Sequence, residues 1–230
     1  MRVVAFTGAG ISRESGLSTF RDSDGLWEGH RVEEVATVDA WRRDPERVLR
    51  FYNERRRALL AAEPNAAHRA LAELERDHAV TIVTQNVDDL HERAGSSNVV
   101  HLHGELLKAR SVLDDETLYD CRGDIAIGDL APDGGQLRPH VVWFGEVVEG
   151  LMEAERACLL AEAMLVVGTS LVVQPAASLV GFTRARRIWL VDPNPPDVED
   201  WLGDRVEAIA EPATVGVPIA IARLRDWAGG

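Results

Sequence analysis

The chain has 230 residues, 46% of them hydrophobic, and a formal net charge of −13. This length and hydrophobicity suit one large domain, or one domain with an insertion, and exclude a disordered chain. The acidic balance argues against binding to a nucleic acid, although it is compatible with a basic peptide as substrate. Two cysteines, Cys121 and Cys158, are too few for a disulfide framework or a four-cysteine zinc site, and they fit a reducing cytoplasm.

The apolar runs of the sequence predict neither a signal peptide nor a membrane span. The first apolar run begins two residues after Met1, which leaves no room for a signal peptide. No apolar run approaches the ~18 residues of a membrane span. We therefore expect a cytoplasmic protein that contacts no membrane.

The order of the predicted elements indicates an α/β fold. Six nearly continuous apolar runs are typical of parallel strands covered on both faces, and helical patterns lie between several of them. Their alternation predicts a doubly wound, mostly parallel Rossmann-like sheet with right-handed crossovers. The strands are expected at 3–7, 80–84, 99–103, 140–144, 163–168 and 187–191, and the helices at 44–62, 66–77, 150–162, 175–186 and 213–227.

Two stretches interrupt this alternation. Residues 28–78 hold more chain than one crossover needs, and residues 105–138 are polar, rich in Gly and Asp, and weakly periodic. We interpret both as insertions that form a smaller lobe within a single domain of residues 1–230. The Rossmann-like lobe is then built from about 1–27, 79–104 and 139–230.

Three predicted strands end in residues suited to a dinucleotide. Gly8-Ala9-Gly10 follows the first strand, and a glycine turn lets the backbone approach a phosphate closely, with Ser12 adding a hydroxyl donor. Arg13 stands where the third glycine of the G-x-G-x-x-G fingerprint is expected, which argues against an ordinary dehydrogenase. A second glycine turn, 168–170, and an acid after another strand, Asp192, complete a phosphate and ribose site.

Residues 84–91, TQNVDDLH, follow a further buried strand. Asn86 and Asp88 are two residues apart, so both can face one pocket, where an amide and a carboxylate suit an amide-bearing ligand such as nicotinamide. The competing interpretation is that Asp88 caps a helix that ends at Gly95.

The next strand carries His101 and His103, which point to the same side of a strand. An H-x-H pair can ligate a metal, but no third ligand stands at a recognisable spacing. His103, followed by Gly104 at the strand end, better suits a general base, while a structural or surface role suits His101.

Taken together, these segments resemble the sirtuin family of NAD-dependent protein lysine deacylases. The similarity covers nearly the whole chain, and the motifs stand in the family's order. They are GAGISRESGLSTFR (8–21), TQNVDDLHERAG (84–95), VVHLHGE (99–105), RPHVVWFGE (138–146) and GTSLVVQPAA (168–177).

The resemblance implies a cofactor, NAD, and the residues that hold it. Asp192 stands where the family commonly has Asn, and both can bond ribose hydroxyls. The implied catalytic residues are His103, Asn86 and Asp88, with His103 as the base for a ribose hydroxyl after the acyl oxygen has attacked C1′. The implied cofactor-binding residues are Gly8, Ala9, Gly10, Ile11, Phe20, Arg21, Gln85, Asn86, Val87, Asp88, Gly168, Thr169, Ser170, Asp192, Asn194 and Ala213.

The implied substrate is an acyl-lysine peptide, added as a strand beside Val142, Phe144, Gly145 and Glu146. The chain is most similar to the bacterial class III subgroup, in which a Tyr-x-x-Arg pair binds acidic acyl groups. Tyr52 and Arg55 match that pair on one helical face, and the fork of an arginine suits a carboxylate. We therefore expect desuccinylation or demalonylation alongside deacetylation. The alternative is that Arg55–Arg57 form a solvated basic face and Tyr52 packs in the core.

One departure from the family concerns zinc. Family members usually hold the small lobe with zinc on two cysteine pairs before the RPxVVWFGE motif, but this region has Cys121 alone. We expect no metal, and other packing must hold the lobe.

Three alternative functions remain open. They are an NAD glycohydrolase or ADP-ribosyltransferase on the same fold, a non-catalytic module that binds NAD or acyl-lysine, and, last, a dehydrogenase. Oligomeric state and protein targets do not follow from the sequence.

Overall fold

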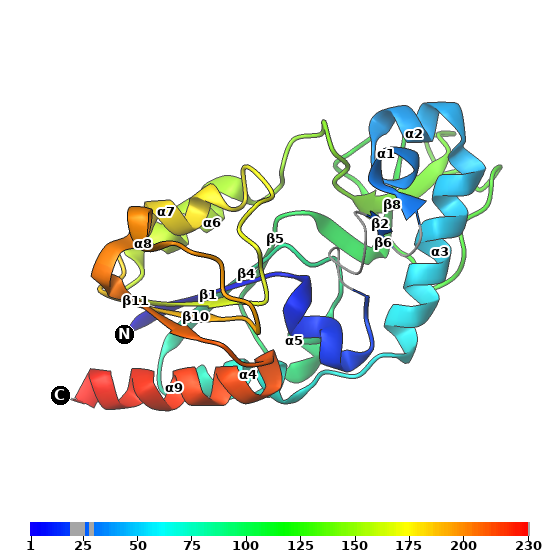
Figure 1. Cartoon of the computed structure of the whole chain (residues 1–230). Coiled ribbons are helices and arrows are strands. Elements are labelled where there is room, and N and C mark those ends of the chain that lie inside the picture. The colour runs from blue at the N-terminus through cyan, green and yellow to red at the C-terminus, as the bar shows by residue number, and fades with distance from the viewer. Residues whose placement is uncertain (19–25, 28–29, 230) are drawn as a thin grey trace.

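The computed structural model describes residues 1–18, 26–27 and 30–229. Its centre is a sheet with the strand order β11-β10-β9-β1-β4-β5, in which all neighbouring strands are parallel (Figure 1). The chain runs outward from β1 to β5 and then continues on the other side of β1, which confirms the doubly wound α/β fold. The strands are β1 (Arg2–Thr7), β4 (Ala79–Thr84), β5 (Val99–His101), β9 (Ala163–Val167), β10 (Arg187–Val191) and β11 (Val206–Ile209).

Helices cover both faces of this sheet because successive strand residues point to opposite sides. Val3 and Ala5 belong to a core shared with α4 and α9, whereas Val4 and Phe6 belong to one shared with α6 and α7. Accordingly, α4 and α9 lie below the sheet in Figure 1 and α6 and α7 above it. The helices are α4 (Ala66–Leu74), α5 (Leu90–Ala94), α6 (Leu151–Leu160), α7 (Ser178–Phe182), α8 (Glu199–Leu202) and α9 (Ala213–Gly229).

A third core lies beside the carboxyl ends of the central strands. It joins α1–α3 to a small antiparallel sheet of order β7-β6-β8, with Phe51, Tyr52 and Trp143 at its centre. The elements of this region are β2 (Leu26–Trp27), β3 (His30–Arg31), α1 (Val32–Val35), α2 (Val38–Arg43), α3 (Pro45–Ala61), β6 (Gly104–Ser111), β7 (Leu118–Asp120) and β8 (Leu137–Val141); two 3-10 helices, η1 (Ala9–Ser15) and η2 (Gly203–Arg205), complete the fold.

The cap residues start two helices as expected. The Asp44 side chain accepts a hydrogen bond from the Arg47 amide (3.0 Å), with Pro45 in the first position of α3. The Asn65 side chain accepts one from the Ala67 amide (2.9 Å) at the start of α4. Both side chains satisfy amides that the first turn of a helix leaves unpaired.

Four sequence predictions of elements were wrong or incomplete. The run 140–144 is not a parallel strand: β8 ends at Val141 and pairs antiparallel with β6, since a short apolar run does not specify its partner. Strand β6 falls within residues that we expected to be irregular, and β11, which contains a glutamate, was missed. Helix α7 is shorter than expected. The boundaries of the two lobes stay a prediction.

Side chains of helix α3 form hydrogen bonds both to the irregular segment after β7 and to the small sheet. Asn53 exchanges two hydrogen bonds with the backbone of Ile125, donating to its carbonyl (2.9 Å) and accepting from its amide (3.0 Å). The buried guanidinium of Arg56 donates to the carbonyls of Leu106 (3.0 Å) and Gly123 (3.2 Å). One face of α3 therefore holds residues 123–125 in place.

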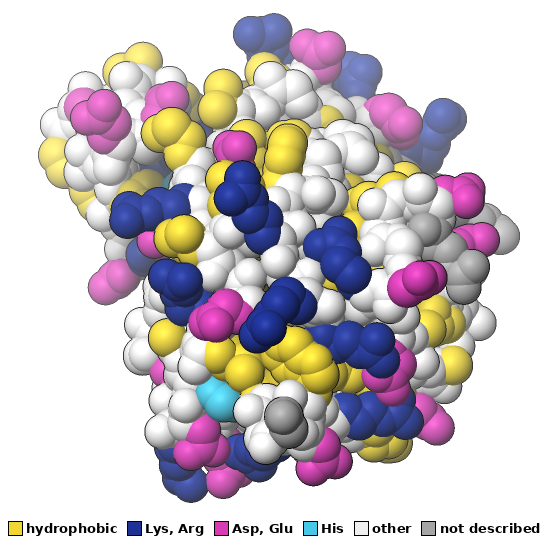
Figure 2. Space-filling view, turned by 90° about the vertical axis from the view of Figure 1, so that its left-hand side faces the viewer, with side chains coloured by type: hydrophobic (Ala, Val, Ile, Leu, Met, Phe, Trp, Pro, Cys, Tyr) yellow, Lys and Arg dark blue, Asp and Glu magenta, His cyan; other side chains and the backbone are white. Residues whose placement is uncertain are grey.

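The end of the molecule where the strands of the central sheet begin is rich in charge. Figure 2 shows arginine side chains gathered there around hydrophobic surface. Some of these side chains form ion pairs, as Arg187 does with Glu207 (2.9 Å) and Arg225 with Asp77 (3.2 Å).

No helix in the described ranges is long and apolar enough to cross a membrane.

Candidate functional site

Two glycine turns pack against each other at the carboxyl ends of β1 and β9. The Gly8 amide donates to the Val167 carbonyl (3.0 Å) and the Gly10 amide to the Gly168 carbonyl (2.9 Å). A Cβ on Gly10 would lie 2.6 Å from Gly168 Cα, and one on Gly168, whose φ is +61°, would lie 2.4 Å from Ile11 N. Backbone therefore meets backbone, which only glycine allows. The chain then enters the 3-10 helix η1, on which Arg13 is exposed, so the usual third glycine has no packing role here.

A cavity of about 660 Å³ opens above these turns and extends to α3 and to the segment after β8. It is lined by twenty of the residues that the sequence predicted. They are Gly8, Ala9, Gly10, Tyr52, Arg55, Gln85, Asn86, Val87, Asp88, His103, Val142, Phe144, Gly145, Glu146, Gly168, Thr169, Ser170, Asp192, Asn194 and Ala213.

Three predicted residues are not among the lining. Ile11 is fully buried in the core shared with α4 and α9, because η1 turns its side chain away from the cavity. Phe20 and Arg21 lie outside the described residues. Conversely, Trp27, Ala36 and Leu59 line the cavity without having been predicted.

Asn86 and Asp88 face one buried corner of the cavity and are linked through Ser12. The Ser12 hydroxyl donates to Asp88 Oδ2 (2.9 Å), and Asn86 Nδ2 donates to Ser12 Oγ (3.3 Å) and to the Gly8 carbonyl (3.2 Å). Burial raises the pKa of Asp88, and the Ser12 hydrogen bond opposes this shift. Asp88 Oδ1 also accepts from the Leu90 amide (3.2 Å), the first residue of α5, so the carboxylate serves both the cavity and the helix start.

His103 presents one ring nitrogen to the cavity. Its Nδ1 donates to the Gln85 carbonyl (2.9 Å), and since a carbonyl only accepts, the proton of the neutral ring resides on Nδ1. Nε2 is then the basic nitrogen. Burial lowers the pKa of His103, against the smaller opposing effect of the Gln85 bond. A neutral imidazole with an unprotonated Nε2 is the form that a general base needs.

The other end of the cavity is formed by α3. Tyr52 is fully buried, and burial raises the pKa of its hydroxyl. Arg55 is half-buried, with its guanidinium 4.3 Å from the Trp27 ring centroid. Of the next two arginines, Arg56 is buried and bonded to the carbonyls of Leu106 and Gly123, whereas Arg57 is exposed beside Asp124. The three consecutive arginines therefore do not form one solvated face.

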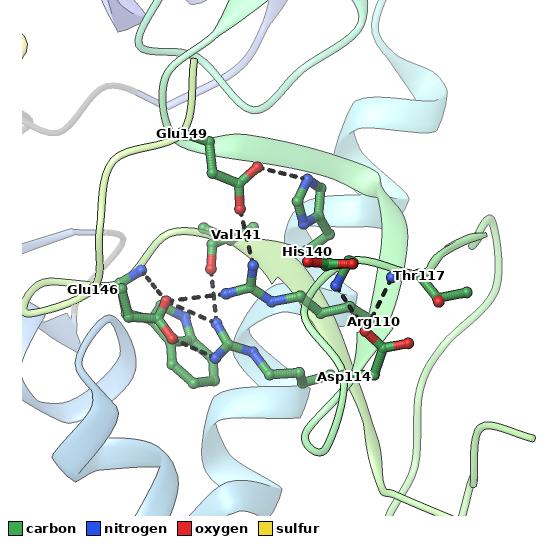
Figure 3. A network of polar contacts seen from close by, with 10 residues as sticks. Arg110, Asp114, Thr117, His140, Val141, Glu146 and Glu149 are labelled. Carbon is green, nitrogen blue, oxygen red and sulfur yellow. Dashed lines mark hydrogen bonds and ion pairs between the residues drawn. The ribbon is translucent and has the colours of Figure 1, made fainter. Parts of the chain in front are cut away.

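The carboxylate of Glu146 is engaged by neighbouring side-chain and backbone donors, although the residue lines the cavity. It accepts from Arg138 (2.6 Å) and from the Trp143 amide (2.7 Å) and lies 3.5 Å from Arg110 (Figure 3). Burial raises its pKa, but the Arg138 hydrogen bonds and charge outweigh burial, so the pKa lies below its usual value. The guanidinium of Arg138 stacks on the Trp143 ring at 3.3 Å. Sequence reasoning missed Arg138 because its partners follow no periodic spacing.

The same network continues to Glu149, which accepts from Arg110 (2.9 Å) and pairs with His140 (3.2 Å) (Figure 3). These contacts tie β6 and β8 to the segment 146–149. Within the described part of the chain, no three His, Cys, Asp or Glu side chains are grouped to hold a metal ion.

Asp192 follows the carboxyl end of β10 and is buried. Its Oδ1 accepts a hydrogen bond from the Asn194 amide (2.9 Å), which turns the chain after β10. Gln85 Nε2 donates to Thr169 Oγ1 (3.0 Å) and joins the ends of β4 and β9. The carboxyl ends of four parallel strands thus contribute polar groups to one cavity, as is general for ligand sites in such sheets.

Known proteins are similar to this chain in sequence and fold. The model of the Sir2 family matches residues 8–175. An NAD-dependent protein deacylase of Helicobacter pylori is 49% identical over 229 residues, covering 98% of each chain. A solved complex of a Sir2 homologue with NAD is 40% identical, with a TM-score of 0.86 over 97% of this chain and 89% of the other. A Sir2 protein bound to acetylated peptide is 30% identical, with a TM-score of 0.80 over 97% and 93%. The chain belongs to the Sir2 family.

Proposed function

We propose that the chain is an NAD-dependent protein deacylase that removes acetyl, succinyl and malonyl groups from lysine and releases nicotinamide, O-acyl-ADP-ribose and free lysine. One observation carries the proposal. A single cavity joins the glycine turns and His103 at one end to Tyr52 and Arg55 at the other. Relatives named NAD-dependent protein deacylase, with identities near 50%, support the general reaction.

The residues present fit NAD. The packed turns of Gly8, Gly10 and Gly168 leave no Cβ between the backbone and a phosphate group, and Asp192 offers a carboxylate for ribose hydroxyls. Asn86 and Asp88 supply an amide and a carboxylate at a buried corner suited to a carboxamide. NAD, when bound, supplies an electrophilic ribose carbon and nicotinamide as the leaving group.

His103 is the proposed base. Its Nε2 is unprotonated in the neutral ring and accepts a proton from a hydroxyl brought to the cavity, while its Nδ1 stays bonded to the Gln85 carbonyl. The closed, partly apolar surroundings of Trp143 and Tyr52 limit the access of water.

Arg55 and Tyr52 are proposed to select acidic acyl groups. The guanidinium of Arg55 is held by stacking near Trp27 and offers a planar pair of donors to a carboxylate. The buried Tyr52 hydroxyl remains protonated because burial raises its pKa, so it can donate to the same group. The peptide backbone is proposed to lie along Val142, Phe144 and Gly145, of which Phe144 is 48% exposed.

Mass spectrometry of succinyl-lysine and acetyl-lysine peptides, each with and without NAD, tests the proposal. NAD-dependent loss of the acyl group together with O-acyl-ADP-ribose is the expected result. Free nicotinamide and ADP-ribose with intact peptides would instead indicate a glycohydrolase. Transfer of ADP-ribose to protein would indicate an ADP-ribosyltransferase. Binding of NAD or peptide without any product would indicate a non-catalytic module.

A further inference from the structure

Four consecutive carbonyl groups hold the segment that follows β4. The β4–β5 ladder ends at the pair Thr84 and His101, yet the carbonyls of residues 84–87 are all bonded to residues 101–106. Two of the donors are backbone amides and two are imidazoles. They are Leu102 N to Thr84 O (2.9 Å), His103 Nδ1 to Gln85 O (2.9 Å), His101 Nδ1 to Asn86 O (2.9 Å) and Leu106 N to Val87 O (2.8 Å).

His101 differs from His103 in having a second partner. Its Nε2 lies 2.8 Å from Glu92 Oε1 of α5, and the imidazole is only 10% exposed. A carbonyl and a carboxylate both only accept hydrogen bonds, so the two contacts together are satisfied by an imidazolium with a proton on each nitrogen. The H-x-H pair therefore combines a neutral ring that lines the cavity with a charged ring outside the cavity lining.

We propose that His101 is a positioning residue: as an imidazolium anchored by Glu92, it fixes the Asn86 carbonyl and thereby orients Asn86 and Asp88 at the nicotinamide end of the cavity. The inference rests on the proposed function for the identity of that end. The Asn86 amide is bonded to Thr84 Oγ1 (3.0 Å) and its side chain to the Gly8 carbonyl (3.2 Å), so the bond from His101 leaves no backbone polar group of Asn86 unbonded.

The surroundings of His101 favour its charged form. Glu92 faces it from α5, Glu105 from β6, and the buried Asp88 from the segment that it holds, whereas His91 of α5 is the neighbouring titratable base. Burial lowers the pKa of His101, but the hydrogen bond and charge of Glu92 outweigh burial and raise it above its usual value. When pH rises through this pKa, Nε2 loses its proton and its lone pair faces the Glu92 carboxylate. The anchor to α5 is then lost.

Three variants test the role. His101→Ala removes both contacts, His101→Asn keeps a donor near the position of Nδ1 but has no charge, and Glu92→Gln keeps a polar partner without the charge. His78→Asn is the matched control, since His78 precedes β4 and so lies at the end of that strand away from Asn86 and Asp88. For each variant we would measure kcat/KM for NAD from pH 6 to 10, NAD affinity by calorimetry, and Tm.

We expect His101→Ala to lower kcat/KM for NAD by about tenfold, the usual effect of losing a hydrogen bond to a charged group. His101→Asn should recover most of this loss at neutral pH and flatten the alkaline limb of the profile. Glu92→Gln should move that limb to lower pH. His78→Asn should change Tm at most.

Superposable pH profiles for the wild type and His101→Asn, or a lower Tm of His101→Ala with unchanged kcat/KM and NAD affinity, would overturn the role. The calorimetric measurement of NAD affinity distinguishes a wrong role for His101 from a wrong proposed function. If the wild type binds NAD but does not deacylate, the pH dependence of NAD affinity in the same variants still decides the role of His101.

Discussion

Replacing Arg55 by methionine is expected to lower kcat/KM for succinyl peptides and to leave kcat/KM for acetyl peptides nearly unchanged. Methionine retains an unbranched side chain that can pack near Trp27, whereas the guanidinium, half-buried at 4.3 Å from that ring, is lost. A hydrogen bond to a charged group contributes about 1.5–3 kcal/mol, which corresponds to a loss of about 10- to 150-fold in kcat/KM for the succinyl peptide. An acetyl group offers no carboxylate, so its kcat/KM should stay within about threefold of the wild-type value.

The assay compares steady-state kinetics on succinyl and acetyl peptides of identical sequence at saturating NAD. Arg57→Met is the matched control, because Arg57 lies two residues further along α3 and pairs with Asp124 at the surface. It should leave both rates unchanged. An equal loss on the two peptides in Arg55→Met, or the same selectivity change in Arg57→Met, would refute the assignment of Arg55 to the acyl carboxylate.

Three further outcomes follow from the contacts described. His103→Ala should lower kcat by at least about 100-fold while calorimetry still detects NAD binding; the wild-type acid limb should lie below the usual histidine pKa of 6.5, because burial lowers the pKa of His103. Gly10→Ala should weaken NAD binding and lower Tm, since its Cβ would meet Gly168 Cα at 2.6 Å, whereas Gly123→Ala, with nothing within 4 Å, should do neither. Glu146→Gln should destabilise the fold by about 3 kcal/mol, or roughly 6–12 °C in Tm. Because the folded pKa of Glu146 is lowered, its contribution is present above the usual carboxyl pKa of 4.5 and is lost as pH falls through the folded value; thermal melts should therefore show the difference from wild type closing in acid.

The strand ends of the site were predictable from the sequence for a physical reason. The carboxyl ends of parallel strands meet at one edge of a sheet, so Gly8, Asn86, Gly168 and Asp192 could be brought together from strand order alone. All four line one cavity. Local patterns were enough because each residue stands within two residues of the end of an apolar run.

Other parts of the site depend on contacts that no local pattern records. The partner of the Glu146 carboxylate is Arg138, on the preceding strand, and Ser12 donates to Asp88, 76 residues away in the chain. The antiparallel pairing of β8 was missed for the same reason, since apolar character shows that a strand is buried but not which strand lies beside it. These positions are decided by tertiary packing.

The two faces of α3 have a consequence for how this protein can diverge. One face carries Tyr52 and Arg55 into the cavity, and the next residues along each turn, Asn53 and Arg56, hold the backbone at 123–125. A shift of α3 large enough to admit a different acyl chain would also break the bonds to that backbone. The α3 end of the cavity and the path of the backbone at 123–125 are therefore linked, so that a rearrangement of the first requires a rearrangement of the second.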